Sequence, residues 1–537
     1  MPLIRRFSST VAAATFSVLL LSIVSFGQVG ITTYHNDNYR TGWNSSETIL
    51  TPANVNPSHF GLLTTVPVDD QIDAQPLFVA GVNITAGSFP GKHNVVYVVT
   101  GNDTVYAIDA NAGTVLLSNH LGTPVRLPLG CNNNAPNVGI TATPVIDIAR
   151  NNLYTIAYIQ GTNGPTYQVH ALDLGNLTDK LTPVTVSASH TLTDGTSFVF
   201  SAKVQRQRPA LLEANGNIYA GFGSFCDEAG STSRGWLLGW DARTLTPLAA
   251  NQLFDTQASD VDSFYLSSIW MSGYGPAADD SGNVLFVTAN SDPSGTTYDG
   301  ITNIQESVVK VSADLTTVVD LFTPSNWSSL DQHDLDFGSG GVMVLPDQPG
   351  TIPHMAVAAG KQGNLFLMNE DDLGGYSSTG NNVLATKFIN PCWCGPSYFS
   401  YKGIGFVLTS GGTAMKLFEV VTSPSPTLNP ISSAGISSGQ DGGFFTSISS
   451  NKNANYIIWA LSRPLSKSAP AMTLYAFAPN TQGKLSLIFS GIAGQWPNFT
   501  GNSNQVPTIA NGKVYVGSNQ QLQIFGLIST KPATKKK

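Results

Sequence analysis

Charged side chains are scarce in this sequence. Asp, Glu, Lys and Arg make up 11% of its 537 residues, and the formal net charge is −8. Proteins that bind nucleic acid neutralise its phosphates with clustered lysine and arginine. The basic run here is the C-terminal TKPATKKK, which we predict to lie in a disordered tail, residues 528–537. The composition therefore argues against nucleic acid as a partner.

Long apolar runs and helix-forming runs rich in Ala, Glu, Leu and Lys are nearly absent. The exception is at the N-terminus, where Arg5 and Arg6 precede the apolar stretch Val11–Val24, and the small residues Ser25 and Gly27 follow. This layout predicts a secretory signal peptide over residues 1–27 and a secreted or periplasmic protein with no stable membrane span after cleavage. An uncleaved membrane anchor is the alternative, although the stretch is short for a span of ~20 residues.

Cysteine is also rare, with Cys131, Cys226, Cys392 and Cys394 the four present. An exported protein can form disulfides, and four cysteines allow three pairings. We predict a Cys131–Cys226 disulfide. Cys392 and Cys394 are expected to stand too close in sequence for an unstrained bridge.

Glycine, by contrast, is abundant, and the 52 glycines help to mark a repeat. Each repeated unit has a polar lead-in, a Gly or Pro, an apolar strand, a turn and a second apolar strand, as in QRPALLEANGNIYAGFG. Turns such as ANGN and DSGN are typical of β-hairpins. Eight units begin near Pro76, Pro144, Pro209, Pro276, Gly341, Pro396, Phe444 and Pro507, and the first four intervals are 65 to 68 residues long.

Eight β-rich units of this length predict an all-β fold, an eight-bladed β-propeller of four-stranded antiparallel blades over residues 60–527. A blade buries its faces only against neighbouring blades, so the ring must close. The last unit supplies three strands, residues 505–511, 513–518 and 522–527, and we predict that Phe60–Val68 completes it as a closing strand. Seven blades plus an edge strand is the alternative.

The residues before the propeller, 28–59, form a predicted lead-in. Within it, Tyr34–Ser46, YHNDNYRTGWNSS, is dense in polar and aromatic groups. We expect this stretch to lie across one face of the ring as a cap.

The repeats resemble the pyrroloquinoline-quinone (PQQ) propellers, that is, the quinoprotein alcohol dehydrogenases and their non-enzymatic relatives. VYAIDANAGTVLLSNHL, with Ala107, Asp109 and Gly113, is similar to the family's A-x-D-x-x-T-G-x-x-x-W docking motif. Ala112 stands in place of its Thr, and Leu117 in place of its Trp. GWLLGWDARTLTPL is a second, looser copy. The resemblance covers roughly Tyr34 to Leu527 and implies the propeller fold.

In the enzymes of that family, PQQ and Ca²⁺ bind near the propeller axis, and a carboxylate base accepts the proton of the alcohol. The resemblance implies Asn290 as an amide ligand of calcium, with Asp227 or Glu228 as a carboxylate ligand. It implies Lys361 as the basic residue that touches the quinone. Glu306 falls near the catalytic carboxylate, where the family has Asp.

Two walls of the family's cofactor slot have no match. Cys131 is followed by Asn132, so the vicinal cysteine pair is missing. The tryptophan that floors the slot is replaced by Gly273 and Tyr274, and Trp270 is out of register. Losing an aromatic floor would forfeit about 0.5–1.5 kcal/mol of stacking.

Three functions remain open. The favoured one is an exported scaffold that holds a protein or small-molecule ligand in its funnel, with no cofactor. The alternative is a PQQ- and Ca²⁺-dependent dehydrogenase. The third is a hydrolase or lyase that uses His333, Asp334 and Asp336, which precede the strand GGVMVLPD. Turn formation and strand entry explain the same three residues without any chemistry.

Overall fold

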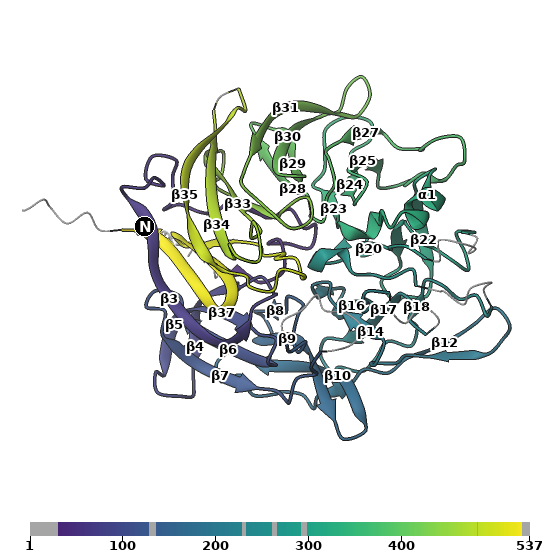
Figure 1. The fold of residues 1–537 in the computed structure, drawn as a ribbon, viewed down its shortest axis with the longest axis horizontal. Helices are drawn as coiled ribbons and strands as arrows, with labels where there is room; N and C mark the ends of the chain where they lie inside the picture. The colour runs from purple at the N-terminus through teal and green to yellow at the C-terminus, as the bar shows by residue number, and fades with distance from the viewer. Residues whose placement is uncertain are drawn as a thin grey trace, which may run out of the picture.

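The structure is a computed structural model that describes residues 30–127, 136–227, 232–259, 266–291, 298–480 and 482–528. The predicted signal peptide, Cys131, Glu228 and nearly all of the predicted tail lie outside these ranges. The described chain is almost entirely β-strand, and its sheets are arranged as eight blades around one axis (Figure 1). The prediction of an all-β, eight-bladed propeller is confirmed.

Each blade is an antiparallel sheet that meanders outward from the axis. Blade 1 contains β4 (Leu77–Ile84), β5 (Gly91–Val99), β6 (Thr104–Asp109) and β7 (Val115–His120). Blade 2 contains β8 (Val145–Asp147), β9 (Asn152–Gly161), β10 (Gly164–Asp173) and β11 (Val184–Thr185). Blade 3 contains β14 (Gln205–Gln207), β15 (Leu212–Ala214), β16 (Asn217–Ser224), β17 (Trp236–Asp241) and β18 (Gln252–Leu253), and the hairpin β12 (Ser189–Thr191)–β13 (Ser197–Val199) precedes it. Blade 4 contains β19 (Ala277–Ala278), β20 (Val284–Val287), β21 (Val308–Val311) and β22 (Val318–Thr323), with β26 (Gly375–Tyr376) parallel at its outer edge.

The second half of the ring follows the same plan. Blade 5 contains β23 (Val342–Leu345), β24 (Met355–Ala359), β25 (Asn364–Asn369) and β27 (Ala385–Phe388). Blade 6 contains β28 (Ser397–Tyr401), β29 (Ile404–Gly411), β30 (Ala414–Val421) and β31 (Thr427–Gly435). Blade 7 contains β32 (Thr446–Asn451), β33 (Ala454–Leu461), β34 (Ala471–Pro479) and β35 (Leu485–Gln495). Helical residues are confined to α1 (Trp327–Gln332) and the single turns η1 (Met271–Gly273) and η2 (Phe337–Ser339) in the described chain.

Blade 8 closes the ring with strands from both ends of the chain. It contains β36 (Thr508–Ala510), β37 (Lys513–Leu527) and β3 (Phe60–Gln71), and β3 pairs antiparallel with β37 from Phe60↔Leu527 onward (Figure 1). The predicted closing strand is thus confirmed. The two strands predicted at 513–518 and 522–527 both fall within β37, in which Gln520 takes a positive φ of 57°.

The first described residues line the inside of the ring, and we call residues 30–47 the channel segment. It includes β1 (Gly30–Ile31), which pairs with β4, and β2 (Trp43–Asn44), which runs parallel to β32. Its hydrogen bonds pass from blade to blade in order: Thr32 O accepts from Ile146 N, Asn38 Nδ2 donates to Glu213 O, Asn38 O accepts from Ala278 N, Tyr39 O from Val344 N, Thr41 O from Tyr398 N, Gly42 O from Ile448 N, and Asn44 Nδ2 donates to Ile509 O. One short segment therefore touches all eight blades.

Tyr274 shows how closely the inner parts of the blades approach this segment. Its ring lies between Gly341 and Gly395, where an added Cβ would come within 2.0 Å of ring atoms at either glycine. Its hydroxyl donates to Arg40 O at 2.9 Å and to Pro396 O at 3.0 Å. The glycines in these lead-ins are needed because the ring fills the space that a side chain would occupy.

The disulfide between Cys392 and Cys394 corrects one expectation. Only one residue separates them, yet their Cα atoms are 5.0 Å apart, which is within the range that a disulfide bridges. The Cys–Trp–Cys backbone bends at Trp393 and Cys394, which brings the two Cα atoms closer than the roughly 6.6–7.2 Å of an extended chain. Closeness in sequence therefore does not prevent the bond. Cys226 is also disulfide-bonded, while Cys131 lies outside the described residues, so the Cys131–Cys226 pairing stays a prediction.

In the described part of the chain, no helix has the length and apolar character that crossing a membrane requires.

Candidate functional site

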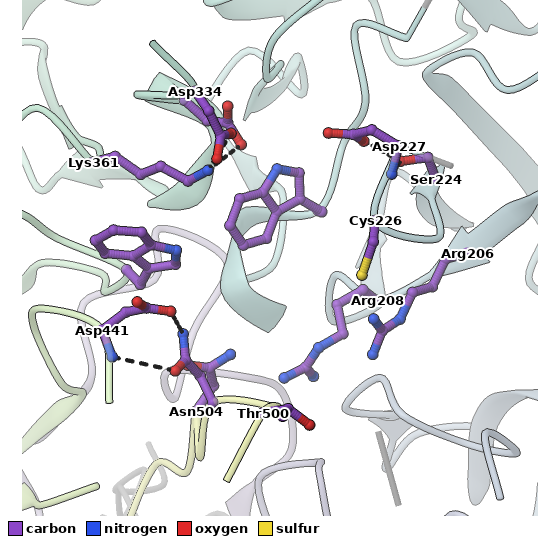
Figure 2. A pocket seen from close by; sticks show the side chains of 14 residues that line it. Arg206, Arg208, Ser224, Cys226, Asp227, Asp334, Lys361, Asp441, Thr500 and Asn504 are labelled. Atoms are coloured by element: carbon purple, nitrogen blue, oxygen red, sulfur yellow. Dashed lines mark hydrogen bonds and ion pairs between the residues drawn. The ribbon is translucent and has the colours of Figure 1, made fainter. Parts of the chain in front are cut away.

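A cavity of about 290 Å³ opens at one end of the central channel, and we call it the funnel (Figure 2). Its walls come from the lead-ins to the innermost strands and from loops that follow the second strand of a blade. The lining residues are Arg206, Arg208, Ser224, Cys226, Asp227, Trp270, Asp334, Asp336, Lys361, Trp393, Asp441, Thr500, Asn502 and Asn504.

Lys361 is the cationic centre of one wall. It follows β24, and its Nζ lies 2.6 Å from Asp334 Oδ1 and 3.1 Å from Asp336 Oδ2. The same Nζ lies 5.7 Å from the ring centroid of Trp270 and 5.6 Å from that of Trp393. Burial alone would lower the pKa of Lys361, but the neighbouring carboxylates outweigh burial and raise that pKa above its ordinary value. The ammonium is therefore permanently charged and fixed between two aromatic faces.

Three carboxyl groups lie together behind Lys361. Glu306, Asp331 and Asp336 are each less than 5% exposed. Burial, as the largest cause, raises the pKa of Asp336 and that of Asp331 to about 7 each. Burial and the charges of Asp336 and Asp331 also raise the pKa of Glu306 well above its ordinary value.

The hydrogen bonds of this carboxyl cluster are incomplete. Glu306 Oε2 accepts from Phe337 N at 2.5 Å, whereas Glu306 Oε1 and Asp336 Oδ1 have no partner. Like charges this close cannot all ionise, so the cluster retains protons near neutral pH. A buried carboxyl whose pKa is near 7 can exchange a proton with a bound molecule.

Asp227 and Asn290 form a smaller polar group on the next wall. Ser224 donates to Asp227 Oδ1, and Asn290 Nδ2 lies 3.5 Å from Asp227 Oδ2. Burial raises the pKa of Asp227 despite these contacts. The amide nitrogen of Asn290 is thereby directed at the carboxylate.

Two arginines lie side by side across the funnel from Lys361 (Figure 2). Arg208 Nη1 donates to Thr141 O at 3.1 Å, and its guanidinium packs on Gly273, where a Cβ would lie 2.8 Å from Nη1. Arg206 lies 5.9 Å from the ring centroid of Phe225. Burial and, after it, the charge of Arg208 lower the pKa of Arg206 to about 10, which still leaves it charged at neutral pH. Two adjacent guanidinium groups favour an anion between them.

The structure brings most of the predicted site residues together. Asp334, Asp336, Lys361 and Asp227 line the funnel, and Glu306 and Asn290 contact its wall residues from behind. His333 does not line the funnel: it is exposed at the end of α1, where its Nδ1 lies 2.9 Å from Ser329 O. Glu228 lies outside the described residues, so its predicted role as a ligand stays a prediction.

Sequence reasoning missed Asp331, Trp393 and the arginine pair. The pair was visible in QRQRP, which occupies the same lead-in position as HDLDFGSGG. Trp393 was missed because it lies between Cys392 and Cys394, for which we predicted no disulfide and therefore no fixed loop. With Trp270 it supplies the aromatic surface that the sequence appeared to lack.

The funnel fits PQQ better than it fits calcium. PQQ is a flat ring system with carboxylate groups, and two tryptophans, two arginines and a lysine line the cavity. Calcium needs several free oxygen ligands. Within the described ranges no three His, Cys, Asp or Glu residues are grouped to hold a metal ion, and Lys361 already pairs with Asp336.

Comparisons with known proteins bear on the fold. No family model matches the chain, and no curated protein matches it. The solved structures that resemble it include a quinohemoprotein alcohol dehydrogenase from Comamonas testosteroni, with 13% identity, a TM-score of 0.60, and coverage of 94% of this chain and 82% of that one. A quinohemoprotein alcohol dehydrogenase from Pseudomonas putida HK5 gives 13% identity, a TM-score of 0.58, and coverage of 95% and 82%. The chain therefore has the fold of the PQQ-type propellers, as the repeats predicted.

Proposed function

We propose that this propeller binds a small, flat, anionic molecule in its funnel and acts outside the cytoplasm. The observation that carries the proposal is that one wall of the cavity has two arginines and the opposite wall has two tryptophans. Arg206 and Arg208 face the cavity opposite the Lys361 wall, where Trp270 and Trp393 flank the ammonium. A flat anion can stack on an indole ring while its carboxylates bind the guanidinium groups.

The charge balance of the funnel supports this choice of ligand. The two carboxylates near Lys361 already neutralise that ammonium. Arg208 has no carboxylate within ion-pair distance in the described part of the chain. Its charge is nevertheless buried, because Arg208 is only 7% exposed. An anion next to a buried guanidinium gains about 1.5–3 kcal/mol for each charge-assisted hydrogen bond.

The experiment is a titration with PQQ, followed by tryptophan fluorescence. We expect saturable quenching at micromolar PQQ, unchanged by EDTA, because Trp270 and Trp393 line the cavity and calcium is not needed for stacking. Arg208→Gln should weaken binding about tenfold, since it removes one charged donor. Arg243→Gln, an exposed change on the turn after β17, should have no effect. Absence of saturation up to roughly 100 μM would contradict the proposal for this quinone.

A PQQ- and Ca²⁺-dependent dehydrogenase is the second candidate function. The buried carboxyls favour it, because Asp336 and Asp331 have pKa values of about 7 and can accept a proton from a bound alcohol. PQQ, when bound, would take the hydride. Dye reduction that requires an alcohol, PQQ and Ca²⁺ together, and that is lost in Asp336→Asn, would support this candidate over simple binding.

A further inference from the structure

A second cavity lies between blades 6 and 7, away from the funnel. Its volume is about 530 Å³. The turns that border it join β28 to β29, β32 to β33, and β34 to β35. Antiparallel strands place these turns at the opposite ends of the strands from the funnel loops, so the cavity opens on the other face of the ring. We call it the rear cleft.

Aromatic side chains build one side of the rear cleft. Phe399 and Phe406 are directly opposite one another across β28 and β29, and their rings stack with centroids 5.1 Å apart. Tyr456 from blade 7 lies 5.3 Å from Phe399 and 5.7 Å from Tyr401, ring centroid to ring centroid. The hydroxyl of Tyr456 donates to Ser400 O at 2.6 Å, which fixes its ring across the gap between the blades. Leu417 and Ile431 add aliphatic surface.

One carboxylate stands among these apolar groups. Glu419 is directly opposite Phe406 across β29 and β30, so the two side chains share one face of the blade. Glu419 is half-buried, and within the described ranges its carboxylate has no hydrogen bond or ion pair. No lysine or arginine is among the described residues that line the cleft. Its rim is otherwise neutral, formed by Asn453, Asn455, Asn480 and Gln482.

We propose that the rear cleft binds a small organic ammonium ion with an apolar body. The body would lie against Phe406, Leu417 and Ile431, and the ammonium would reach Glu419 and the neighbouring aromatic rings. A carboxylate beside aromatic rings attracts an ammonium through charge and through the ring quadrupoles. The cleft volume is within the range of small-molecule sites. This ligand is opposite in charge to the one proposed for the funnel.

The test compares 4-phenylbutylammonium with 4-phenylbutanol, which has the same apolar body without the charge. Calorimetric titrations of the full chain should show the ammonium binding at least about tenfold more tightly than the alcohol. Glu419→Gln should reduce the affinity for the ammonium to that for the alcohol and leave the alcohol unchanged. Phe406→Ala should weaken both, because it removes a wall that both ligands use. Asp314→Asn, an exposed carboxylate on the turn before β22, is the matched control and should change neither.

Equal affinity of the native protein for the two compounds would overturn the proposal. Binding of the ammonium that Glu419→Gln leaves unchanged would also overturn it, because the ammonium would then lie elsewhere. The funnel contains acidic and aromatic groups as well, so Asp334→Asn is measured in parallel. Loss of ammonium binding in that variant, with no loss in Glu419→Gln, would assign the ligand to the funnel and not to the rear cleft.

Discussion

The channel segment and the funnel hold their buried charges in different ways. In the channel segment, Arg40 is fully buried and makes five hydrogen bonds, four of them to backbone carbonyls. In the funnel, buried carboxyl oxygens of Glu306 and Asp336 have no partner. Polar groups that a fold buries without partners need an explanation, and binding or proton exchange is one. The comparison indicates that Arg40 serves stability, whereas the carboxyl groups of the funnel are buried at some cost in stability.

The largest effect should come from the channel segment. Arg40→Ala removes the guanidinium that donates to two carbonyls of different blades, Pro276 O and Leu211 O, and to two carbonyls of the channel segment itself. We expect a loss of about 3–5 kcal/mol in the free energy of unfolding, measured by denaturant titration. Arg243→Ala, which changes an exposed arginine, should cost less than about 0.5 kcal/mol. If both variants lost the same amount, the contrast between the two parts of the channel would fail.

A smaller effect should follow from opening the Cys392–Cys394 disulfide. The bond closes a loop of three residues, so Cys392→Ser with Cys394→Ser should cost about 1.5 kcal/mol of stability. Trp393 N still donates to Gly442 O, and Trp393 O still accepts from Arg463, so the loop stays in place. We therefore expect PQQ affinity to fall only a few-fold. Complete loss of binding would show that the disulfide, and not these hydrogen bonds, positions Trp393.

A third effect should be a change in pH dependence. The pKa values of Asp331 and Asp336 are about 7 in the folded protein, above the value of about 3.9 for an unfolded aspartate. The folded state therefore binds more protons between pH 4 and pH 7, and stability falls as the pH rises through this window. The groups that face Asp336 are Lys361, Asp334, Asp227, Asp331 and Glu306.

Asp331→Asn sharpens this test, because it removes one of the titrating groups and keeps the shape of the side chain. The slope of unfolding free energy against pH should become shallower by at most about 1.4 kcal/mol per pH unit. Denaturant titrations at pH 4.5, 5.5, 6.5 and 7.5 would measure it. An unchanged slope would mean that Asp331 is ionised in the folded protein throughout this range.

The fold could be predicted because its signals are local and periodic. Apolar strands, hairpin turns and a regular spacing of lead-ins define the blades, and Phe60–Val68 was recognisable as a strand without a blade of its own. The path of the channel segment could not be predicted. Its contacts with the ring use mostly backbone groups, such as Thr41 O and Gly42 O, and these leave no pattern in side chains.

Only part of the funnel could be predicted, namely the residues that a local sequence signal marks. Lys361 and Asp227 were found through resemblance to a family motif, and Asp334 and Asp336 through their position before a strand. Asp331 lies on a helix that the strand pattern did not indicate. The error over Cys392 and Cys394 came from judging distance by sequence separation, when the bent backbone between them places the two Cα atoms 5.0 Å apart, within the reach of a disulfide.

The channel segment and β3 also have a consequence for how the protein is made. Both are synthesised before any blade is complete, yet their partners include Ile509 and the strand that ends at Leu527. The contacts with blade 8 cannot form until β37 has been synthesised, so the ring closes only after the other seven blades have been made. A prematurely terminated chain would keep an open sheet edge and exposed apolar surface, which chaperones and proteases recognise. Closure of the ring therefore requires that the strands at both ends of the propeller are present.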